Sequence, residues 1–356
     1  MRSFMANHEA PGELGDVDGR PVVLHYGDVE AEYAALRTGT LLVDRSLRGR
    51  LRARGEKAKE MITGLVTNDV LSLEPGHGQY AAALTPKGKI IADVRIFLDG
   101  DTLLIDAPPR AFPGFLAMLK KYLNPRVVPF EDESAATNDL CVAGTNSRLV
   151  LAEAFGAPSA TLGTLPPYGQ IAVEVDGVSI LVARTPDVGV DAFDCFIPAA
   201  SLDALRTRLL AAGARPGGLQ AWEIARIETG RPEWGLDIDE TTIAQEANLD
   251  EMHAISYTKG CYTGQETVAR VHFRGHVNRY LRGLMFDTED PAPARATVSD
   301  ASGKPVGEIR SGTRSPRVGA IALAMVRREI EPGTALTATW EGGERETRVV
   351  RLPFPA

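Results

Sequence analysis

The chain has 356 residues, of which 44% are hydrophobic and 24% charged, and its formal net charge is −8 at pH 7. These values are typical of a globular protein of two or three domains. They argue against broad nucleic-acid binding, and the lack of any run of roughly 20 apolar residues argues against a membrane span.

The N-terminal part of the chain predicts alternating strands and helices. Residues 1–20 are expected to form a polar leader, without the apolar core of a signal peptide. A helix is predicted over 27–36, with Asp28 as its N-cap and Gly39 at its end. Five strands are predicted next, at 40–43, 47–53, 80–84, 90–98 and 102–106. Two further helices are predicted at 55–65 and 111–123.

The rest of the chain changes from mixed to pure β structure. Its first part predicts strands at 171–175, 178–184 and 193–197 and helices at 199–212 and 217–229. After Tyr280 only short strands are predicted, with a last hairpin turning at Gly342-Gly343. This density of strands and glycine turns predicts a small barrel or sandwich that begins near 278–283.

A helix is predicted after the segment Lys259–Glu266. Thr263 and Glu266 have the spacing of a capping box, so Thr263 is expected to be the N-cap. The helix should run from Gly264 to about His272 and end at Gly275.

Cys261 lies just ahead of this helix and two residues from Lys259. Both features favour a reactive thiolate, whereas the alternative of equal weight is a thiol that fills a small apolar pocket. Cys141 and Cys195 lie in apolar strands and are expected in the core. Three widely separated cysteines imply no disulfide framework, which favours a reducing cytoplasm.

Glu228 falls next to Ala225 on the apolar stripe of the helix at 217–229. A carboxylate there needs a partner. One interpretation is a buried ion pair with Arg226, Arg231 or another arginine. The other is a paired contact with the two parallel N–H donors of a heterocycle such as a pterin.

Two segments carry a resemblance to a known family. Lys259–Glu266 resembles the K-G-C-Y-x-G-Q-E signature of YgfZ-type folate-binding proteins, relatives of the glycine-cleavage T-protein (aminomethyltransferase), and Arg226–Gly230 resembles that family's R-[LI]-E-A-G segment, whose glutamate holds the pterin ring. The resemblance covers about residues 25–356. The motif loop consists of Lys259, Gly260, Cys261, Tyr262, Gly264, Gln265 and Glu266, followed by Arg270.

Two other segments depart from the aminomethyltransferase pattern. Residues 84–94 resemble a strand-turn-strand that reads G-G-x-x-D-D in those enzymes, but here Ala92-Asp93 replaces the acidic pair. Residues 184–191 lack the tyrosine and glutamate of R-T-G-Y-T-G-E-D. Folate binding is still expected, while aminomethyl transfer is disfavoured. Lys87, Lys89 and Arg95 are candidates for the glutamyl tail of folate or, alternatively, a solvated basic turn.

The resemblance implies an α+β fold of three domains around a folate cleft, two with antiparallel sheets and one a C-terminal β-barrel. The expected domains are 1–50 with 140–278, the inserted 51–139, and 279–356.

The function that the resemblance implies is a tetrahydrofolate-binding accessory protein for iron–sulfur cluster assembly or repair, and through it for tRNA-modifying enzymes. Tetrahydrofolate, or a one-carbon-substituted form, is expected at Glu228, Asp93 and Tyr80, with Cys261 and Lys259 as the reactive pair. The expected partners are folate and iron–sulfur client or assembly proteins, with no nucleic acid, no membrane, no permanent metal ion and no second copy of the chain. The alternatives are a folate-dependent one-carbon (aminomethyl) transferase or demethylase, and a scaffold without folate.

Overall fold

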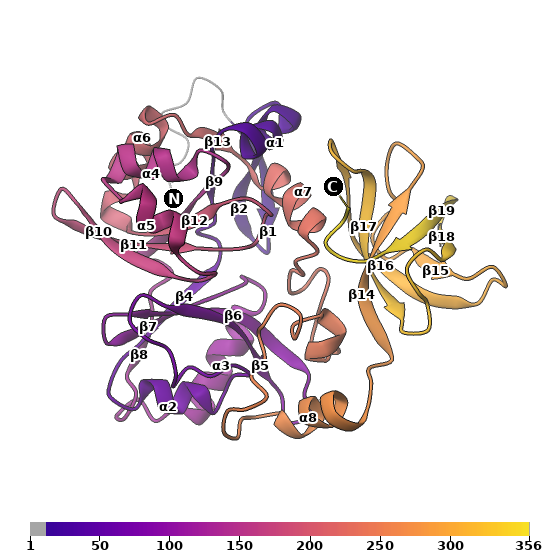
Figure 1. The fold of residues 1–356 in the computed structure, drawn as a ribbon, viewed down its shortest axis with the longest axis horizontal. Coiled ribbons are helices and arrows are strands. Elements are labelled where there is room, and N and C mark those ends of the chain that lie inside the picture. Colours follow the sequence, from indigo (N-terminus) through magenta and orange to yellow (C-terminus); the bar gives the residue numbers. More distant parts are fainter. Residues whose placement is uncertain (1–11, 356) are drawn as a thin grey trace. The chain divides into compact units, whose positions relative to one another are not determined.

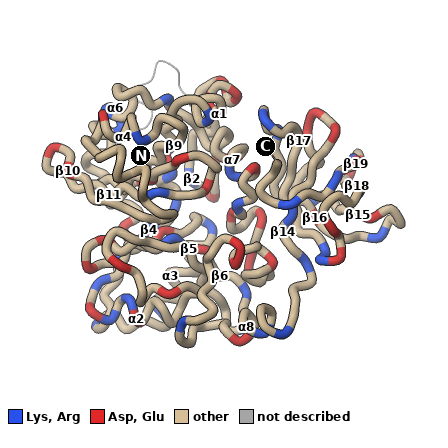
Figure 2. The backbone as a smooth tube through the Cα atoms, viewed as in Figure 1, with Lys and Arg blue, Asp and Glu red and all other residues tan. Residues whose placement is uncertain are grey.

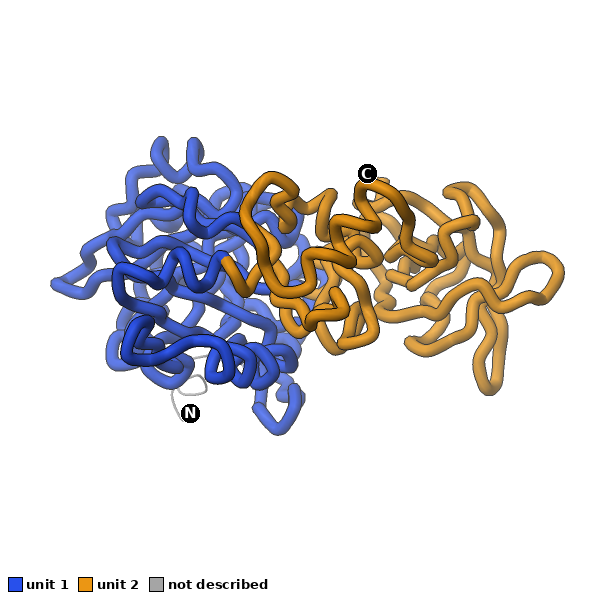
Figure 3. Tube along the Cα trace, turned by 90° about the horizontal axis from the view of Figure 1, so that it is seen from below, with its two compact units in different colours: residues 1–63, 69–80, 94–222 blue, residues 64–68, 81–93, 223–356 orange. Residues whose placement is uncertain are grey.

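The computed structural model describes residues 12–355. The chain divides into two compact units, coloured separately in Figure 3: residues 1–63, 69–80 and 94–222 make the first, and residues 64–68, 81–93 and 223–356 make the second. No helix among the described residues is long and apolar enough to cross a membrane. The three-domain boundaries expected from the sequence stay a prediction.

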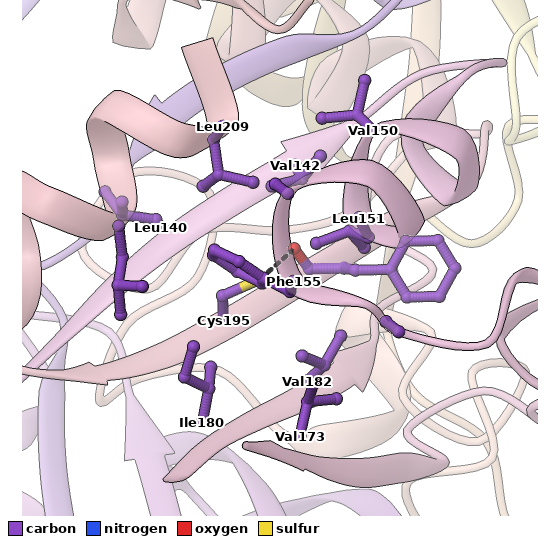
Figure 4. Close-up of a cluster of buried hydrophobic side chains, with 14 of the residues drawn as sticks. Leu140, Val142, Val150, Leu151, Phe155, Val173, Ile180, Val182, Cys195 and Leu209 are labelled. Carbon is purple, nitrogen blue, oxygen red and sulfur yellow. Dashed lines mark hydrogen bonds between the residues drawn. The ribbon is translucent and has the colours of Figure 1, made fainter. Parts of the chain in front are cut away.

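A six-stranded sheet in the first unit has the order β10-β11-β12-β9-β3-β13, with only the β3–β13 pair parallel (Figure 1). Helices α4 and α6 cover one face, where Val150 and Leu209 pack over strand residues such as Val142 and Cys195 (Figure 4). The elements are β3 (Leu41–Asp44), β9 (Thr137–Ala143), β10 (Gln170–Val175), β11 (Val178–Arg184), β12 (Ala192–Pro198), β13 (Arg215–Gly217), α4 (Ser147–Phe155), α5 (Ser159–Thr164), η1 (Ala199–Ser201) and α6 (Leu202–Ala211).

A second sheet has five strands in the order β5-β6-β7-β4-β8. Strands β5 and β6 each contain residues of both units, whereas β4, β7 and β8 belong to the first. The elements of this part are β4 (Gly49–Ala53), β5 (Gly78–Leu84), β6 (Ile90–Asp99), β7 (Thr102–Ala107), β8 (Phe130–Asp132), α2 (Ala58–Thr63) and α3 (Phe112–Tyr122).

The second unit ends in a closed barrel of order β14-β17-β16-β15-β18-β19. Strand β17 is buried on both faces, because alternate residues such as Ala322 point into the barrel and Leu323 packs outward against Ile227 and Phe354. The barrel strands are β14 (Arg279–Phe286), β15 (Thr297–Ser299), β16 (Pro305–Ser315), β17 (Gly319–Arg327), β18 (Ala335–Trp340) and β19 (Gly343–Val350). Helix α7 (Leu219–Thr229), η2 (Ala244–Ala247) and α8 (Gln265–Arg274) precede it.

The α+β class and the C-terminal barrel are confirmed. The polar leader is wrong beyond residue 12, because β1 (Glu13–Val17) and β2 (Arg20–His25) form a hairpin; residues 1–11 lie outside the described part. Its turn consists of Asp18 and Gly19, both with positive φ, which is a known hairpin signal. Helix α1 (Val29–Thr38) has the expected cap, since the Asp28 carboxylate accepts a hydrogen bond from the Ala31 amide at 2.9 Å.

Candidate functional site

The loop before α8 is fixed by Lys259. The Lys259 ammonium donates hydrogen bonds to the carbonyl oxygens of Val66, at 2.6 Å, and Asn68, at 3.0 Å. It also lies 4.6 Å from the centroid of the Tyr262 ring, as a cation–π contact. Lys259 therefore ties the loop to residues 64–68 of the same unit.

Thr67 adds to the same attachment. Its hydroxyl donates to the Ala254 carbonyl at 2.6 Å and accepts from the Ala82 amide at 2.8 Å. The Ser256 amide donates to the Thr67 carbonyl at 3.0 Å. Three segments far apart in the sequence thus meet at one buried threonine.

Helix α8 begins one residue later than the capping-box spacing predicts. Gly264, with a φ of 85°, is its N-cap, and no side-chain hydrogen bond caps the helix, so Thr263 as N-cap is wrong. The Thr263 amide instead donates to the Gly64 carbonyl at 3.1 Å. The chain needs a left-handed residue here, which glycine provides without strain. The end of the helix at Gly275 is confirmed.

The turn at residues 85–89 packs closely against the start of α8. A Cβ on Gly264 would lie 2.7 Å from the Thr85 carbonyl oxygen, and a Cβ on Gly88 would lie 2.7 Å from the Thr267 side chain. Two segments that the sequence singled out separately, 84–94 and the motif loop, therefore lie together in the second unit.

Cys261 is the exposed cysteine, whereas Cys141 and Cys195 are buried. Beside it Tyr262 is buried, and burial raises the pKa of its phenol above the ordinary range. The thiol is thus presented to solvent from a loop whose neighbouring side chains are fixed. The small apolar pocket that the sequence left open for Cys261 is not what the structure contains.

The two residues expected beside folate on β5 and β6 are both buried. Asp93 is 5% exposed, in the second unit, and Tyr80 is 5% exposed, in the first. The Tyr80 ring stacks on Tyr168 with centroids 6.0 Å apart. A buried carboxylate can accept hydrogen bonds from ring N–H groups, and Asp93 as a folate ligand stays a prediction.

Glu228 has the contacts of a buried ion pair. The side chain is 1% exposed; one oxygen accepts a hydrogen bond from the Ser315 hydroxyl, and the other lies 3.3 Å from Nη2 of Arg317. The Phe354 amide donates to the Glu228 carbonyl at 2.9 Å. Glu228 therefore joins the end of α7 to the barrel, which is the alternative role that the sequence left open.

A buried charge cluster lies within the first unit and joins its two sheets. Arg95 on β6 contacts Asp106 on β7 at 2.6 Å and also the carboxylates of Asp194 and Asp139, on β12 and β9. Arg95 is 2% exposed, so the suggestion that it contacts a glutamyl tail is wrong. The cluster comprises Arg45, Arg48, Arg95, Asp106, Asp139, Asp187 and Asp194.

The carboxylates of this cluster differ in their affinity for protons. Burial, reinforced by the neighbouring Asp194 carboxylate, raises the pKa of Asp139 to about 8, against the opposing effect of Arg95. Burial acts in the same direction on Asp106, but the guanidinium groups of Arg48 and Arg95 outweigh it and lower its pKa.

The sequence predicted Glu228 and the motif loop but not the residues that hold them. Ser315 and Arg317, which contact Glu228, and Thr67 and Asp139 were not predicted. The available signal was the presence of charged residues inside apolar strands, such as Asp139 and Asp194 in β9 and β12. Among residues 12–355, no group of three histidine, cysteine or acidic side chains has an arrangement that could hold a metal ion.

The chain matches known proteins along almost its full length. Residues 7–257 match the model of the GCVT N-terminal domain, and residues 279–355 match that of the glycine cleavage T-protein C-terminal barrel domain. The chain is 31% identical to an aminomethyltransferase of Rubrobacter xylanophilus, covering 98% of this chain and 92% of the relative. It is 29% identical to an aminomethyltransferase of Stenotrophomonas maltophilia (strain K279a), covering 98% and 94%.

A crystal structure of the glycine cleavage system aminomethyltransferase T from Bartonella henselae has the same fold. Its TM-score is 0.87 at 24% identity, covering 97% of this chain and 94% of that one. The match bears on the fold alone, and the narrower resemblance to the YgfZ-type branch stays a prediction.

Proposed function

This chain belongs to the glycine-cleavage T-protein family, and from that premise we propose that it binds tetrahydrofolate and acts in one-carbon transfer of the aminomethyltransferase type. Tetrahydrofolate is the cofactor of this family, and when bound it supplies the nitrogen atoms that accept the one-carbon unit. The full-length similarity to aminomethyltransferases supports this function over the accessory role that the motif loop alone implies.

The observation that carries the proposal is the buried carboxylate of Asp93. It is the remaining acidic residue of the segment that resembles the G-G-x-x-D-D strand-turn-strand, and it is 5% exposed on β6. A carboxylate shielded from water can hold a hydrogen bond to an N–H group of a ligand or accept its proton. Asp93 would do this alone, because Ala92 replaces the second acidic residue.

A calorimetric titration with tetrahydrofolate, paired with a turnover assay, tests this proposal. Wild-type protein should bind tetrahydrofolate and form methylenetetrahydrofolate from an aminomethyl-lipoyl donor. Asp93→Asn should lower turnover by about 10²-fold or more, the range for a lost general acid or base. Asp101→Asn, on an exposed turn, is the matched control and should leave both unchanged. Binding without turnover by the wild type would reject one-carbon transfer.

A second candidate function rests on Cys261. Its thiol is exposed on a loop held by Lys259 and Tyr262, as suits a residue that reacts with a partner. The candidate is the accessory role in iron–sulfur cluster assembly or repair, with folate bound but not turned over.

The two candidates differ in what Cys261→Ser should do. An accessory role predicts that cells carrying only Cys261→Ser lose activity of iron–sulfur enzymes, while tetrahydrofolate binding by the purified variant is unchanged. One-carbon transfer through Asp93 predicts that the same variant keeps its turnover. Cys195→Ser is an unsuitable control because Cys195 is buried, so Gly260→Ala, in the same loop, serves instead, since a Cβ there meets nothing within 4 Å.

A further inference from the structure

A group of aromatic rings lies beside the motif loop in the second unit, with His272 and Phe273 exposed and Tyr257 half-buried. The rings of Tyr257 and His272 stack with centroids 3.6 Å apart, and Phe273 meets His272 edge-on at 4.7 Å. Phe273 is 66% exposed, more than the other large hydrophobic residues that the structure describes. Such a side chain at the end of an α-helix is costly to leave in water and often marks an interface.

The same segment is basic in an acidic chain. Residues 267–286 contain four arginines, two histidines and no acidic residue, whereas the whole chain carries a net charge of −8. Figure 2 shows Lys and Arg positions along α8 and the segment leading to β14. Arg270 and Arg274 are exposed and have no ion-pair partner among residues 12–355, whereas Arg279 is paired with Glu246.

A hollow with two arginines and one glutamate in its lining lies beyond the end of α8. Its volume is 510 Å³, and its lining comprises Asn278, Arg327, Arg328 and Glu329. In the barrel, Arg327 is the strand partner of Arg279, so the hollow lies where the chain leaves α8 and enters β14. Because Arg327 is paired with Glu329 at 3.2 Å, as Arg279 is with Glu246, the positive charge of Arg270 and Arg274 on α8 is the part that the described residues leave without an ion pair beside the aromatic rings.

We propose that this α8 surface, formed by Tyr257, Arg270, His272, Phe273 and Arg274, is a docking site for an acidic protein segment that carries an exposed apolar side chain. Unpaired arginines beside a protruding aromatic ring are complementary to carboxylates beside an apolar anchor. The overall charge of −8 disfavours a nucleic acid, and the repulsion between two copies of the basic surface disfavours self-association through it. Cys261 lies in the same loop as Tyr257, so a docked segment would approach the exposed thiol.

Binding of a short fluorescent peptide that alternates glutamate with leucine and phenylalanine tests this proposal on the full-length protein. Phe273→Ala should weaken binding about tenfold, as for a buried aromatic anchor. The double variant Arg270→Glu with Arg274→Glu should weaken it at least as much, and raised salt should reduce wild-type affinity. Leu149→Ala, which removes a side chain that is 64% exposed in the first unit, should leave binding unchanged.

Four outcomes would overturn the proposal. They are no peptide binding by the wild type, equal binding of a peptide with glutamine in place of glutamate, tighter binding of a uridine oligonucleotide or of phosphatidylserine vesicles, and self-association in sedimentation that Phe273→Ala abolishes. Each variant's unfolding in urea is measured alongside, so that lost binding is not mistaken for lost structure. None of these measurements depends on folate.

Discussion

The Glu228 carboxylate is held between a serine and an arginine, and this arrangement predicts a stability effect. Removing one partner of a buried pair leaves the other without compensation, which costs about 3–5 kcal/mol when both are fully buried. The Arg317 side chain is 32% exposed, so water recovers part of that loss. Glu228→Ala should therefore lower the free energy of unfolding in urea by about 2–3 kcal/mol, and Glu228→Gln by about 1 kcal/mol because it keeps the Ser315 contact.

The same variants separate the ion pair from a pterin contact. If Glu228 only joins α7 to the barrel, Glu228→Gln should keep its affinity for tetrahydrofolate. A large loss of affinity at unchanged stability would instead restore the pterin role. Glu344→Ala, at an exposed position of β19, is the control for removing a carboxylate from the barrel.

Only part of this arrangement was predictable from the sequence. Helical spacing predicted that Glu228 lies on an apolar face and needs a partner, because that periodicity is local. It did not identify Arg317, which is 89 residues further along the chain. Contacts of that range are set by how the barrel folds, which short-range patterns do not encode.

The start of α8 depends on the glycine at position 264, so replacing this residue should destabilise the helix and the loop before it. Gly264→Ala would place a Cβ at a φ of 85° and 2.7 Å from the Thr85 carbonyl oxygen. The left-handed conformation alone costs about 1–2 kcal/mol for a residue with a side chain, and the close contact adds to it. The variant should be less stable in urea, and the Cys261 loop should exchange its amide hydrogens faster.

A control for this variant exists in the same loop. Gly260 has no positive φ, and a Cβ built on it meets nothing within 4 Å, so Gly260→Ala should behave like the wild type. Equal stability of the two alanine variants would mean that the turn at Thr85 moves away freely and does not fix the helix.

Helices and strands were predictable where the sequence signal is local, and α8 shows how far such a signal reaches. Its existence and its end at Gly275 followed from the sequence, but its N-cap did not, because the contact with residues 84–88 overrode the capping-box spacing. The β1–β2 hairpin was missed although Asp18-Gly19 is a turn signal, since polar strands with few buried residues have a weak alternation of apolar residues.

At the scale of the whole molecule, composition and strand density predicted the α+β class and the barrel. They did not predict that charges rather than apolar side chains join the two sheets of the first unit. Strands β6, β7, β9 and β12 each contribute a charged residue that looks like an isolated polar position in an apolar run. These polar residues can be explained only as a set, because Arg95 on β6 contacts carboxylates both of its own sheet, on β7, and of the other sheet, on β9 and β12.

This charge cluster makes stability depend on pH through Asp139. Its pKa is raised to about 8 in the folded chain, above the 3.8 that is ordinary for an aspartate, so the folded state binds more protons between these two pH values. The contribution of this raised pKa to the free energy of unfolding is fully present below the pKa of Asp139 in the unfolded chain. It is lost as pH rises toward about 8, by at most about 1.4 kcal/mol per pH unit. Asp106 adds no loss in this window, since its pKa is lowered.

Asp139→Asn should remove this dependence, because the amide keeps the shape of the protonated carboxyl and never ionises. In urea unfolding, the wild type should lose stability relative to Asp139→Asn between about pH 5 and pH 8. Asp101→Asn, on an exposed turn, should lose the same free energy of unfolding as the wild type between pH 5 and pH 8. If Asp139→Asn and the wild type instead lose stability in parallel, the Asp139 carboxyl is already ionised at pH 5, and the arginines of the cluster, above all Arg95 and Arg45, outweigh its burial.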